Sequence, residues 1–94
     1  MALTIKSKSD LAKLIDHTQL NPAASEQEID RLCNEAKKYG FYSVCINPYN
    51  VPRCKRNLSG TDVKVVSVIG FPFGATFKET KAVEAEKAIN EGVQ

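Results

Sequence analysis

Three segments that read as β-strands, each followed by a helical pattern, constrain the fold of this chain more than any other feature. They span residues 14–18, 42–48 and 63–70, and each ends in polar or small residues. Strand and helix patterns that alternate in this way are typical of consecutive βα units on a parallel sheet. Because such folds usually carry their chemistry beyond the carboxyl ends of the strands, we expect functional residues at the ends of these segments.

The length and charge of the chain limit its class. Its 94 residues suit one small domain, residues 1–94, and its net charge of +2 comes from lysines and acids interspersed along the predicted helices. This dispersed charge argues against nucleic acid as a partner. No apolar run reaches the length of a membrane span, and the first residues lack the apolar core of a signal peptide. We therefore expect a cytoplasmic protein without a membrane partner.

Cysteine usage also points to a reducing compartment. Cys33, Cys45 and Cys54 are odd in number and lack CxxC spacing. Neither a disulfide framework nor a metal site is predicted from such a pattern. Three free thiols are the expectation.

Capping patterns indicate where the helices begin. Ser25 and Glu28 have the spacing of a capping box, and Thr76 and Glu79 repeat it for a later helix. Pro52 suits the first turn of a shorter helix between them. A further short helix is expected near the start of the chain, before the first strand.

Side chains alternate between the two faces of each strand. If Val44 and Ile46 face the helices, residues of the other parity face away from them. The face turned away is then predicted to hold Asp16, Thr18, Ser43, Cys45, Asn47, Val65, Ser67 and Ile69. Small and polar residues on that face suit the interior of a closed βα barrel better than a flat sheet covered on both sides.

Three motifs carry a resemblance to a known family. They are Leu14-Ile-Asp-His-Thr-Gln-Leu20, Val44-Cys-Ile-Asn-Pro48 and Val63-Lys-Val-Val-Ser-Val-Ile-Gly-Phe-Pro-Phe-Gly74. In this order and at similar spacing they resemble the amino-terminal part of deoxyribose-phosphate aldolase, and the similarity covers nearly the whole chain from about Leu11. The resemblance implies an α/β fold: the first three βα units of a (βα)8 TIM barrel, with parallel strands and a preceding short helix.

The same resemblance implies a function. The family is a class I aldolase that reversibly cleaves 2-deoxy-D-ribose 5-phosphate to D-glyceraldehyde 3-phosphate and acetaldehyde, through a lysine Schiff base and with neither metal nor other cofactor. It implies that Asp16 and Thr18 help to position this small phosphorylated sugar, and that Cys45 lies next to it in the pocket. These three residues are the candidate substrate-binding residues.

The resemblance further implies that the Schiff-base lysine and the proton-transfer aspartate lie beyond Gln94. Lys64 sits at the wrong end of its strand for a Schiff base, and the other lysines fall on predicted helical segments. We therefore expect a truncated chain that is inactive alone, either as a piece of the enzyme or as a non-catalytic folding or assembly module. Unpaired strand edges and an uncovered inner face predict a homo-oligomer.

Each singled-out residue also has a structural alternative. For Asp16 it is the capping of a loop, and for Cys45 it is the role of a small buried hydrophobe. His17 points opposite to Asp16, so a structural role is favoured over proton transfer. The segment 70–74, Gly-Phe-Pro-Phe-Gly, lacks the spacing of nucleotide-binding glycine loops, and a shaped turn is expected there.

Overall fold

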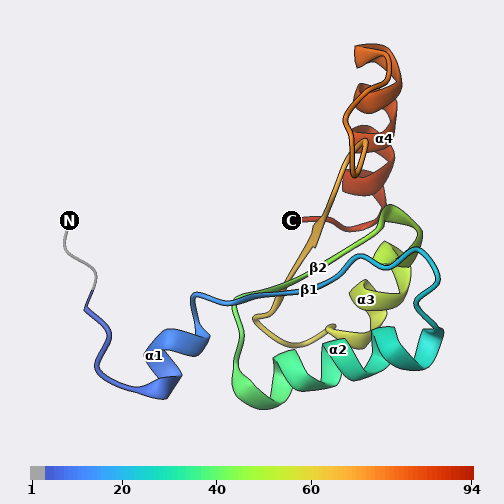
Figure 1. Ribbon diagram of the computed structural model, residues 1–94. Helices are drawn as coiled ribbons and strands as arrows, with labels where there is room; N and C mark the ends of the chain where they lie inside the picture. Colours follow the sequence, from blue (N-terminus) through green and yellow to red (C-terminus); the bar gives the residue numbers. More distant parts are fainter. Residues whose placement is uncertain (1–3) are drawn as a thin grey trace.

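A computed structural model describes residues 4–94, which form one parallel three-stranded sheet with helices (Figure 1). The elements are α1 (Lys8–Ala12), β1 (Asp16–Gln19), α2 (Glu26–Tyr39), β2 (Ser43–Ile46), the 3-10 helix η1 (Pro48–Asn50), α3 (Val51–Asn57), β3 (Lys64–Ser67) and α4 (Lys78–Glu91). The strand order is β1-β2-β3, so three consecutive βα units follow one another as the sequence predicts. Among the described residues, no helix combines the length and the apolar character needed to cross a membrane.

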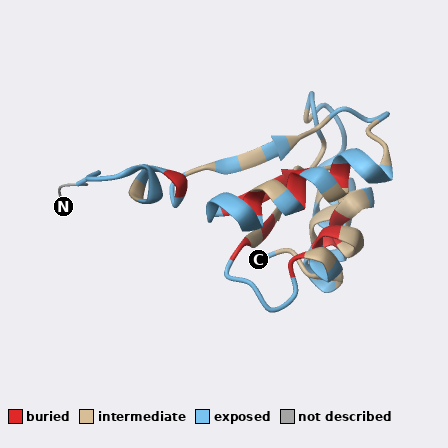
Figure 2. Ribbon diagram, turned by 90° about the horizontal axis from the view of Figure 1, so that it is seen from below, coloured by how far each residue is buried: buried red, intermediate tan, exposed pale blue. Residues whose placement is uncertain are grey.

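The core lies between the sheet and the two helices α2 and α3, which cover one face of it (Figures 1 and 2). It contains Ile29, Leu32, Cys33, Ala36, Val44, Ile46, Val51, Cys54, Leu58, Val63 and Val65. The apolar positions of α2 recur at helical spacing, so one stripe of that helix is buried and the rest is left to solvent. Within residues 4–94, no helix covers the opposite face of the sheet (Figures 1 and 2).

Helix α2 begins and ends as its sequence predicts. The Ser25 hydroxyl accepts a hydrogen bond from the Glu28 backbone N–H at 3.1 Å, and the Glu28 carboxylate reaches back to the Ser25 N–H, which completes the capping box. Gly40 ends the helix at a φ of 67°, a left-handed conformation that glycine adopts without strain from a Cβ atom.

The predicted cap of α4 is wrong. The helix starts at Lys78, its cap residue is Phe77, and no side chain caps the free N–H groups there. Glu79 is therefore the second residue of the helix rather than the third, where a capping box needs its acid. The one-residue shift separates Thr76 from the helix start and removes the reciprocal pair of hydrogen bonds.

The first strand is also shifted from its predicted position. Leu14 and Ile15 precede β1, and Leu14 is half exposed. The Ile15 carbonyl still accepts hydrogen bonds from the Tyr42 and Ser43 N–H groups, at 3.0 and 3.3 Å, which anchors the start of the strand. Asp16 consequently begins the strand and Thr18 is its third residue, whereas the sequence pattern placed both at the end of the strand.

The predicted faces of Val65 and Ser67 are wrong as well, and Ser67 pairs with Ile46 of the core. In the observed register His17, Val44 and Val65 are neighbours across the sheet, and Val65 belongs to the core under the helices. Since neighbours in a parallel sheet share a face, Val66 and not Val65 lies beside Cys45 on the uncovered side. The alternation of side chains could not decide which of Val65 and Val66 faces the helices, because both residues are apolar.

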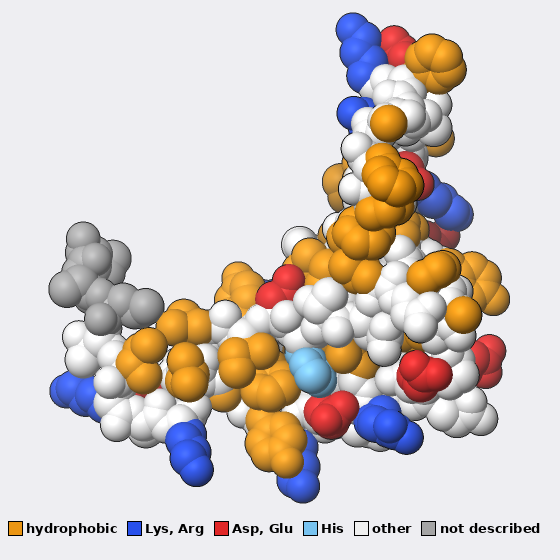
Figure 3. All heavy atoms as spheres, in the orientation of Figure 1, with side chains coloured by type: hydrophobic (Ala, Val, Ile, Leu, Met, Phe, Trp, Pro, Cys, Tyr) orange, Lys and Arg blue, Asp and Glu red, His pale blue; other side chains and the backbone are white. Residues whose placement is uncertain are grey.

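The last residue returns to the sheet, where the Gln94 N–H donates to the Val65 carbonyl at 3.0 Å, but helices α1 and α4 project from the sheet (Figure 1). Helix α4 stands away from it alongside the β3–α4 connection, and α1 lies beyond the opposite end (Figure 1). The radius of gyration is 14.3 Å, against about 12 Å for a compact domain of this length. Hydrophobic side chains are exposed from α1 to α4, as Figure 3 shows.

Candidate active site

The candidate residues gather on the uncovered face of the sheet. Two register rows cross that face: Asp16, Ser43 and Lys64 form the first, and Thr18, Cys45 and Val66 form the second. The second row lies nearer the carboxyl ends of the strands. Strand pairing therefore brings Cys45 beside Asp16 and Thr18, although Cys45 is far from both in sequence.

Asp16 is held by a residue that sequence reasoning did not select. The Ser43 hydroxyl donates a hydrogen bond of 2.6 Å to Asp16 Oδ1, and the Ser43 side chain is almost fully buried. Asp16 itself is exposed on the open face. A buried donor thus fixes one carboxylate oxygen and leaves the other available for hydrogen bonds from a ligand.

Thr18 is exposed two residues further along the same strand face. Its hydroxyl donates to the Asp16 backbone carbonyl at 2.9 Å. This bond fixes the side-chain orientation and leaves the lone pairs of Thr18 Oγ1 free to accept a hydrogen bond. Asp16 and Thr18 together present oxygen atoms suited to the hydroxyl groups of a sugar.

Cys45 lies beside them as an uncharged thiol. Burial raises the pKa of Cys45, and the negative charge of Asp16 raises it further. A thiol that stays protonated is a weak nucleophile. Cys45 therefore suits the wall of a pocket better than the attack on a substrate.

The loops after the strands are tied down by polar contacts. Asn47 donates to the Leu20 carbonyl at 3.1 Å, which joins the ends of β1 and β2. The segment 70–74 forms a turn closed by the Gly74 N–H and the Gly70 carbonyl, as expected from its sequence. Glu84 of α4 accepts the Gly70 N–H at 2.7 Å, so this N–H is not free to bind an anion.

His17 points to the helix side of the sheet. Its ring packs edge-on against Phe41 with centroids 5.0 Å apart, and Nε2 lies 3.6 Å from a carboxylate oxygen of Glu35 on α2. Across β1, His17 alternates with Asp16 and Thr18 and does not reach the open face.

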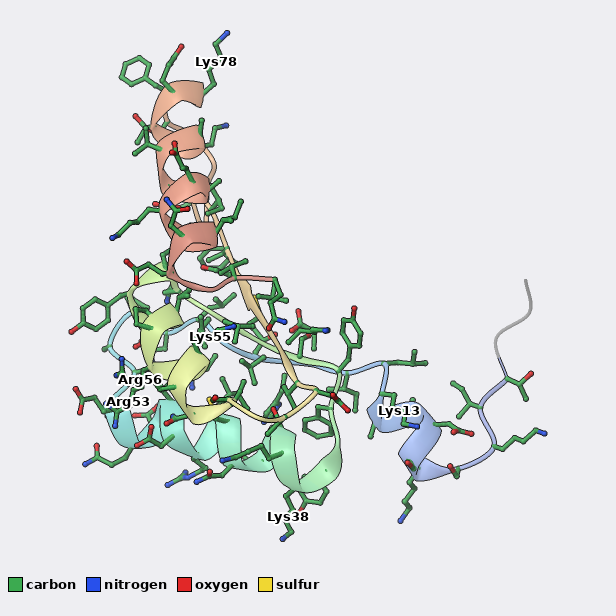
Figure 4. The ribbon with its side chains drawn as sticks, turned by 180° about the vertical axis from the view of Figure 1, so that it is seen from behind. Lys13, Lys38, Arg53, Lys55, Arg56 and Lys78 are labelled. Carbon is green, nitrogen blue, oxygen red and sulfur yellow. The ribbon has the colours of Figure 1, made fainter. Side chains whose placement is uncertain are left out.

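Lysines occupy other parts of the described chain. Within residues 4–94, Lys64 is the only lysine in a strand, and it lies in the first row, at the amino end of β3. Lys38 and Lys78 project from the outer ends of α2 and α4 (Figure 4). The Lys81 ammonium donates to the Gly74 carbonyl at 3.2 Å. Lys81 is thus engaged by the turn after β3, and the Lys64 amine belongs to the row at the amino end of the sheet.

The part of the chain from residue 4 onward contains no group of three His, Cys, Asp or Glu residues placed to hold a metal ion. The site residues there are a carboxylate, a hydroxyl and a protonated thiol. They suit hydrogen bonding to a polar organic ligand.

The alternation of side chains correctly grouped Asp16, Thr18 and Cys45, but it did not reveal that Ser43 binds Asp16. Ser43 has the same parity as Cys45, which was the available signal. Strand register, which sequence periodicity does not supply, was the missing information.

Comparison with known proteins gives this site a context. No protein-family model matches the chain. The deoxyribose-phosphate aldolase of Aciduliprofundum boonei is 57% identical over 83 residues, which cover 88% of this chain and 37% of that relative. This chain thus spans less than two fifths of the length of that relative.

Solved structures agree with the sequence match. A tetrameric deoxyribose phosphate aldolase from Aeropyrum pernix superposes with a TM-score of 0.86 at 38% identity, over 93% of this chain and 37% of its own. A chain from Coccidioides immitis, proposed to be the same aldolase, gives a TM-score of 0.89 at 43% identity, over 94% of this chain and 35% of its own. The three βα units are therefore those of the aldolase barrel, and in sequence and in fold the chain belongs with the amino-terminal part of the deoxyribose-phosphate aldolases.

Proposed function

We propose that this chain supplies one wall of the active site of a class I aldolase that reversibly cleaves 2-deoxy-D-ribose 5-phosphate to D-glyceraldehyde 3-phosphate and acetaldehyde. The observation that carries the proposal is the gathering of Asp16, Thr18 and Cys45 on one open face of a parallel sheet. The identity to the aldolase of A. boonei supports it. The reaction belongs to the breakdown of deoxyribonucleotides in the cytoplasm.

The three residues have distinct roles in this proposal. Asp16, oriented by Ser43, accepts hydrogen bonds from hydroxyl groups of the sugar phosphate, and Thr18 adds a hydroxyl oxygen beside it. Cys45 forms the adjoining wall as a neutral thiol. The Schiff base requires a lysine amine that points at the substrate carbonyl from the reacting end of the barrel. That lysine and the proton-transfer aspartate are proposed to lie in segments beyond residues 1–94.

The first experiment measures cleavage of 2-deoxyribose 5-phosphate by the purified 94-residue chain. Released glyceraldehyde 3-phosphate is reduced in a coupled reaction, and borohydride is added with and without substrate. We expect a folded sample without turnover. Turnover that borohydride abolishes only with substrate present would show that one of these lysines forms the Schiff base.

The second experiment tests the wall itself. Residues 1–94 replace the matching segment of the A. boonei aldolase, and the chimera is assayed with and without Asp16→Asn. Loss of a charged hydrogen-bond acceptor should lower kcat/KM by about 100-fold. Asp62→Asn is the matched control, since Asp62 is exposed in the loop before β3. An Asp16→Asn chimera as active as the Asp62→Asn chimera contradicts the proposed role.

A second candidate function is a non-catalytic module, residues 1–94, that assembles with copies of itself. Its accessible surface is 6641 Å², against about 5,400 Å² expected for a compact monomer of this mass. Strands β1 and β3 are both edges of the sheet. Gln94 binds the Val65 backbone on the outer edge of β3, so the more open edge is that of β1, and unpaired edges favour association between chains. The tetramer described for the A. pernix aldolase makes association plausible in the family.

Light scattering coupled to size exclusion tests this second candidate. We expect a homo-oligomer whose mass is an integer multiple of the 10.3 kDa chain. A lysine introduced on the edge strand β1, as in Thr18→Lys, should shift the distribution of oligomeric states toward monomer. Asp62→Lys, in a loop, should leave that distribution unchanged. A stable, folded monomer at high concentration excludes the assembly function and leaves the aldolase proposal intact.

A further inference from the structure

Two buried thiols from different helices lie against each other in the core. Cys33 is on α2 and Cys54 is on α3, and both side chains are fully buried. Each is a free thiol, both belong to the core cluster between the sheet and the two helices, and each thiol is the largest influence on the pKa of the other. Neither residue lies on the open face that carries the proposed active site, so the pair is independent of that function.

A polar network next to the pair holds the two helices in this arrangement. Asp30, one turn before Cys33, accepts hydrogen bonds from Arg53 and Asn57 of α3 at 2.8 Å. Arg53 is the residue immediately before Cys54 in sequence. Lys37, one turn after Cys33, donates to the Asn57 carbonyl at 3.2 Å, so polar contacts join the two helices on both sides of Cys33.

The environment divides the two thiols into different roles. The hydrogen bond from Cys54 lowers the pKa of Cys33, with smaller help from Asn57 and Lys37, and outweighs the opposing effect of burial. The same bond and burial raise the pKa of Cys54. Of the two, Cys33 more readily forms the thiolate, which is the attacking species in thiol–disulfide exchange.

We propose that Cys33 and Cys54 are a redox-active dithiol, which small disulfides such as oxidised glutathione convert into a covalent cross-link between α2 and α3. The Cys33 thiolate attacks one sulfur of the glutathione disulfide, the S–S bond breaks, and one glutathione leaves with the proton that Cys33 lost. Cys54 then attacks the Cys33 sulfur of the mixed disulfide and expels the second glutathione, which takes the Cys54 proton. Two protein thiols are oxidised by two electrons, and one glutathione disulfide is reduced to two thiols.

Burial limits the access of oxidants to the Cys33–Cys54 pair. Oxidised glutathione reaches Cys33 only when α3, a helix of seven residues, moves away from α2. Once the mixed disulfide forms, the native packing places Cys54 against it and closes the bond. Cys45 points to the other face of the sheet and does not reach either sulfur in the folded chain.

Equilibration in buffers of reduced and oxidised glutathione tests the proposal. The effective concentration of the Cys33–Cys54 pair is measured by acid quenching and mass spectrometry, in native buffer and in concentrated urea. Because native packing preorganises the sulfur atoms, we expect a value about 100-fold higher in the native chain. A disulfide that forms more readily in the native chain than in the unfolded chain stabilises the native chain by the same free energy. The oxidised chain should therefore melt at a higher temperature than the reduced chain.

Tryptic peptides identify the bond, because each cysteine falls in its own peptide. Cleavage after Arg31, Lys37, Lys38, Arg53 and Lys55 yields peptides 32–37, 39–53 and 54–55. We expect 32–37 joined to 54–55, with the mass of two hydrogens lost. Cys45→Ser should leave this product unchanged, and Cys33→Ala should abolish it.

Two results would overturn the proposal. One is a native effective concentration no higher than that in urea, a comparison that needs no variant and so does not depend on whether Cys33→Ala folds. The other is a native cross-link that contains the Cys45 peptide 39–53, which would show that the core pair is not the preferred dithiol.

Discussion

Arg53 donates two parallel hydrogen bonds to the Asp30 carboxylate, from Nε to Oδ1 and from Nη2 to Oδ2, each 2.8 Å long. Asn57 adds a third bond of 2.8 Å to Oδ1. These bonds lower the pKa of Asp30 to about 2, with the hydrogen bonds from Arg53 as the largest cause. The paired residues join α2 to α3 at the edge of the core, and Arg53 also lies 3.2 Å from Glu26.

The lowered pKa predicts a pH dependence of stability. A carboxyl group whose pKa is lowered in the folded state stabilises the fold above its unfolded value of 3.8, and this contribution is lost as the pH falls toward about 2. The urea concentration at the midpoint of unfolding should therefore fall as the pH is lowered between these two values. In Asp30→Asn, which has no charge to protonate, this fall should be smaller.

Asp62→Asn is the control, because Asp62 is an exposed carboxylate outside the network. It should keep the acid dependence of the unmodified chain. An Asp30→Asn chain with the same acid dependence as Asp62→Asn would show that the Arg53 contact does not affect folding.

The third strand offers a matched test of its two faces. Val65 is in the core and Val66 is on the open face beside Cys45. Val65→Ala should lower the free energy of unfolding by about 2 kcal/mol, because it removes buried methyl groups and leaves a cavity. Val66→Ala should cost less than about 1 kcal/mol by the same reasoning. Denaturant titration of both variants measures the difference, and equal losses would contradict the observed register.

These two valines also show what the sequence could and could not predict. The βα order and the grouping of Asp16, Thr18 and Cys45 followed from strand alternation and spacing. The phase of a strand with apolar residues on both faces did not, because adjacent valines satisfy either register. Only pairing with β2, a contact between distant parts of the chain, places Val65 under the helices.

The helix starts illustrate the same limit at shorter range. A Ser or Thr followed three residues later by Glu occurs at Ser25 and at Thr76, yet only Ser25 forms the box. Near Thr76, the turn at 70–74 and its contacts with Lys81 and Glu84 fix where α4 begins. Tertiary contacts thus override a local motif there, whereas α2 starts where its own sequence dictates.

Capping variants test this distinction. Ser25→Ala should lower the free energy of unfolding by about 1 kcal/mol, since it leaves helix N–H groups without an acceptor. Thr76→Ala should change it by much less, because Thr76 does not cap α4. Thermal or urea unfolding of the two variants provides the comparison. A loss for Thr76→Ala as large as that for Ser25→Ala would support the capping box that the sequence suggested.

The last prediction concerns the turn that follows β3. Glu84 accepts the Gly70 N–H at 2.7 Å, and Lys81 donates to the Gly74 carbonyl at 3.2 Å, so α4 holds both ends of the turn 70–74. Glu84→Ala removes the charged acceptor of the Gly70 amide. Hydrogen exchange of that amide should become about tenfold faster, the effect of losing one such bond.

Glu86→Ala is the matched control, since Glu86 is an exposed glutamate on the same helix. It removes the same charge from α4 and should leave Gly70 exchange unchanged. Because the turn follows the carboxyl end of β3, an ordered turn fixes the shape of the sheet at the end where a ligand is proposed to bind. If Glu84→Ala and Glu86→Ala accelerate Gly70 equally, the effect is one of helix charge, and the specific contact between α4 and the turn does not order the loop.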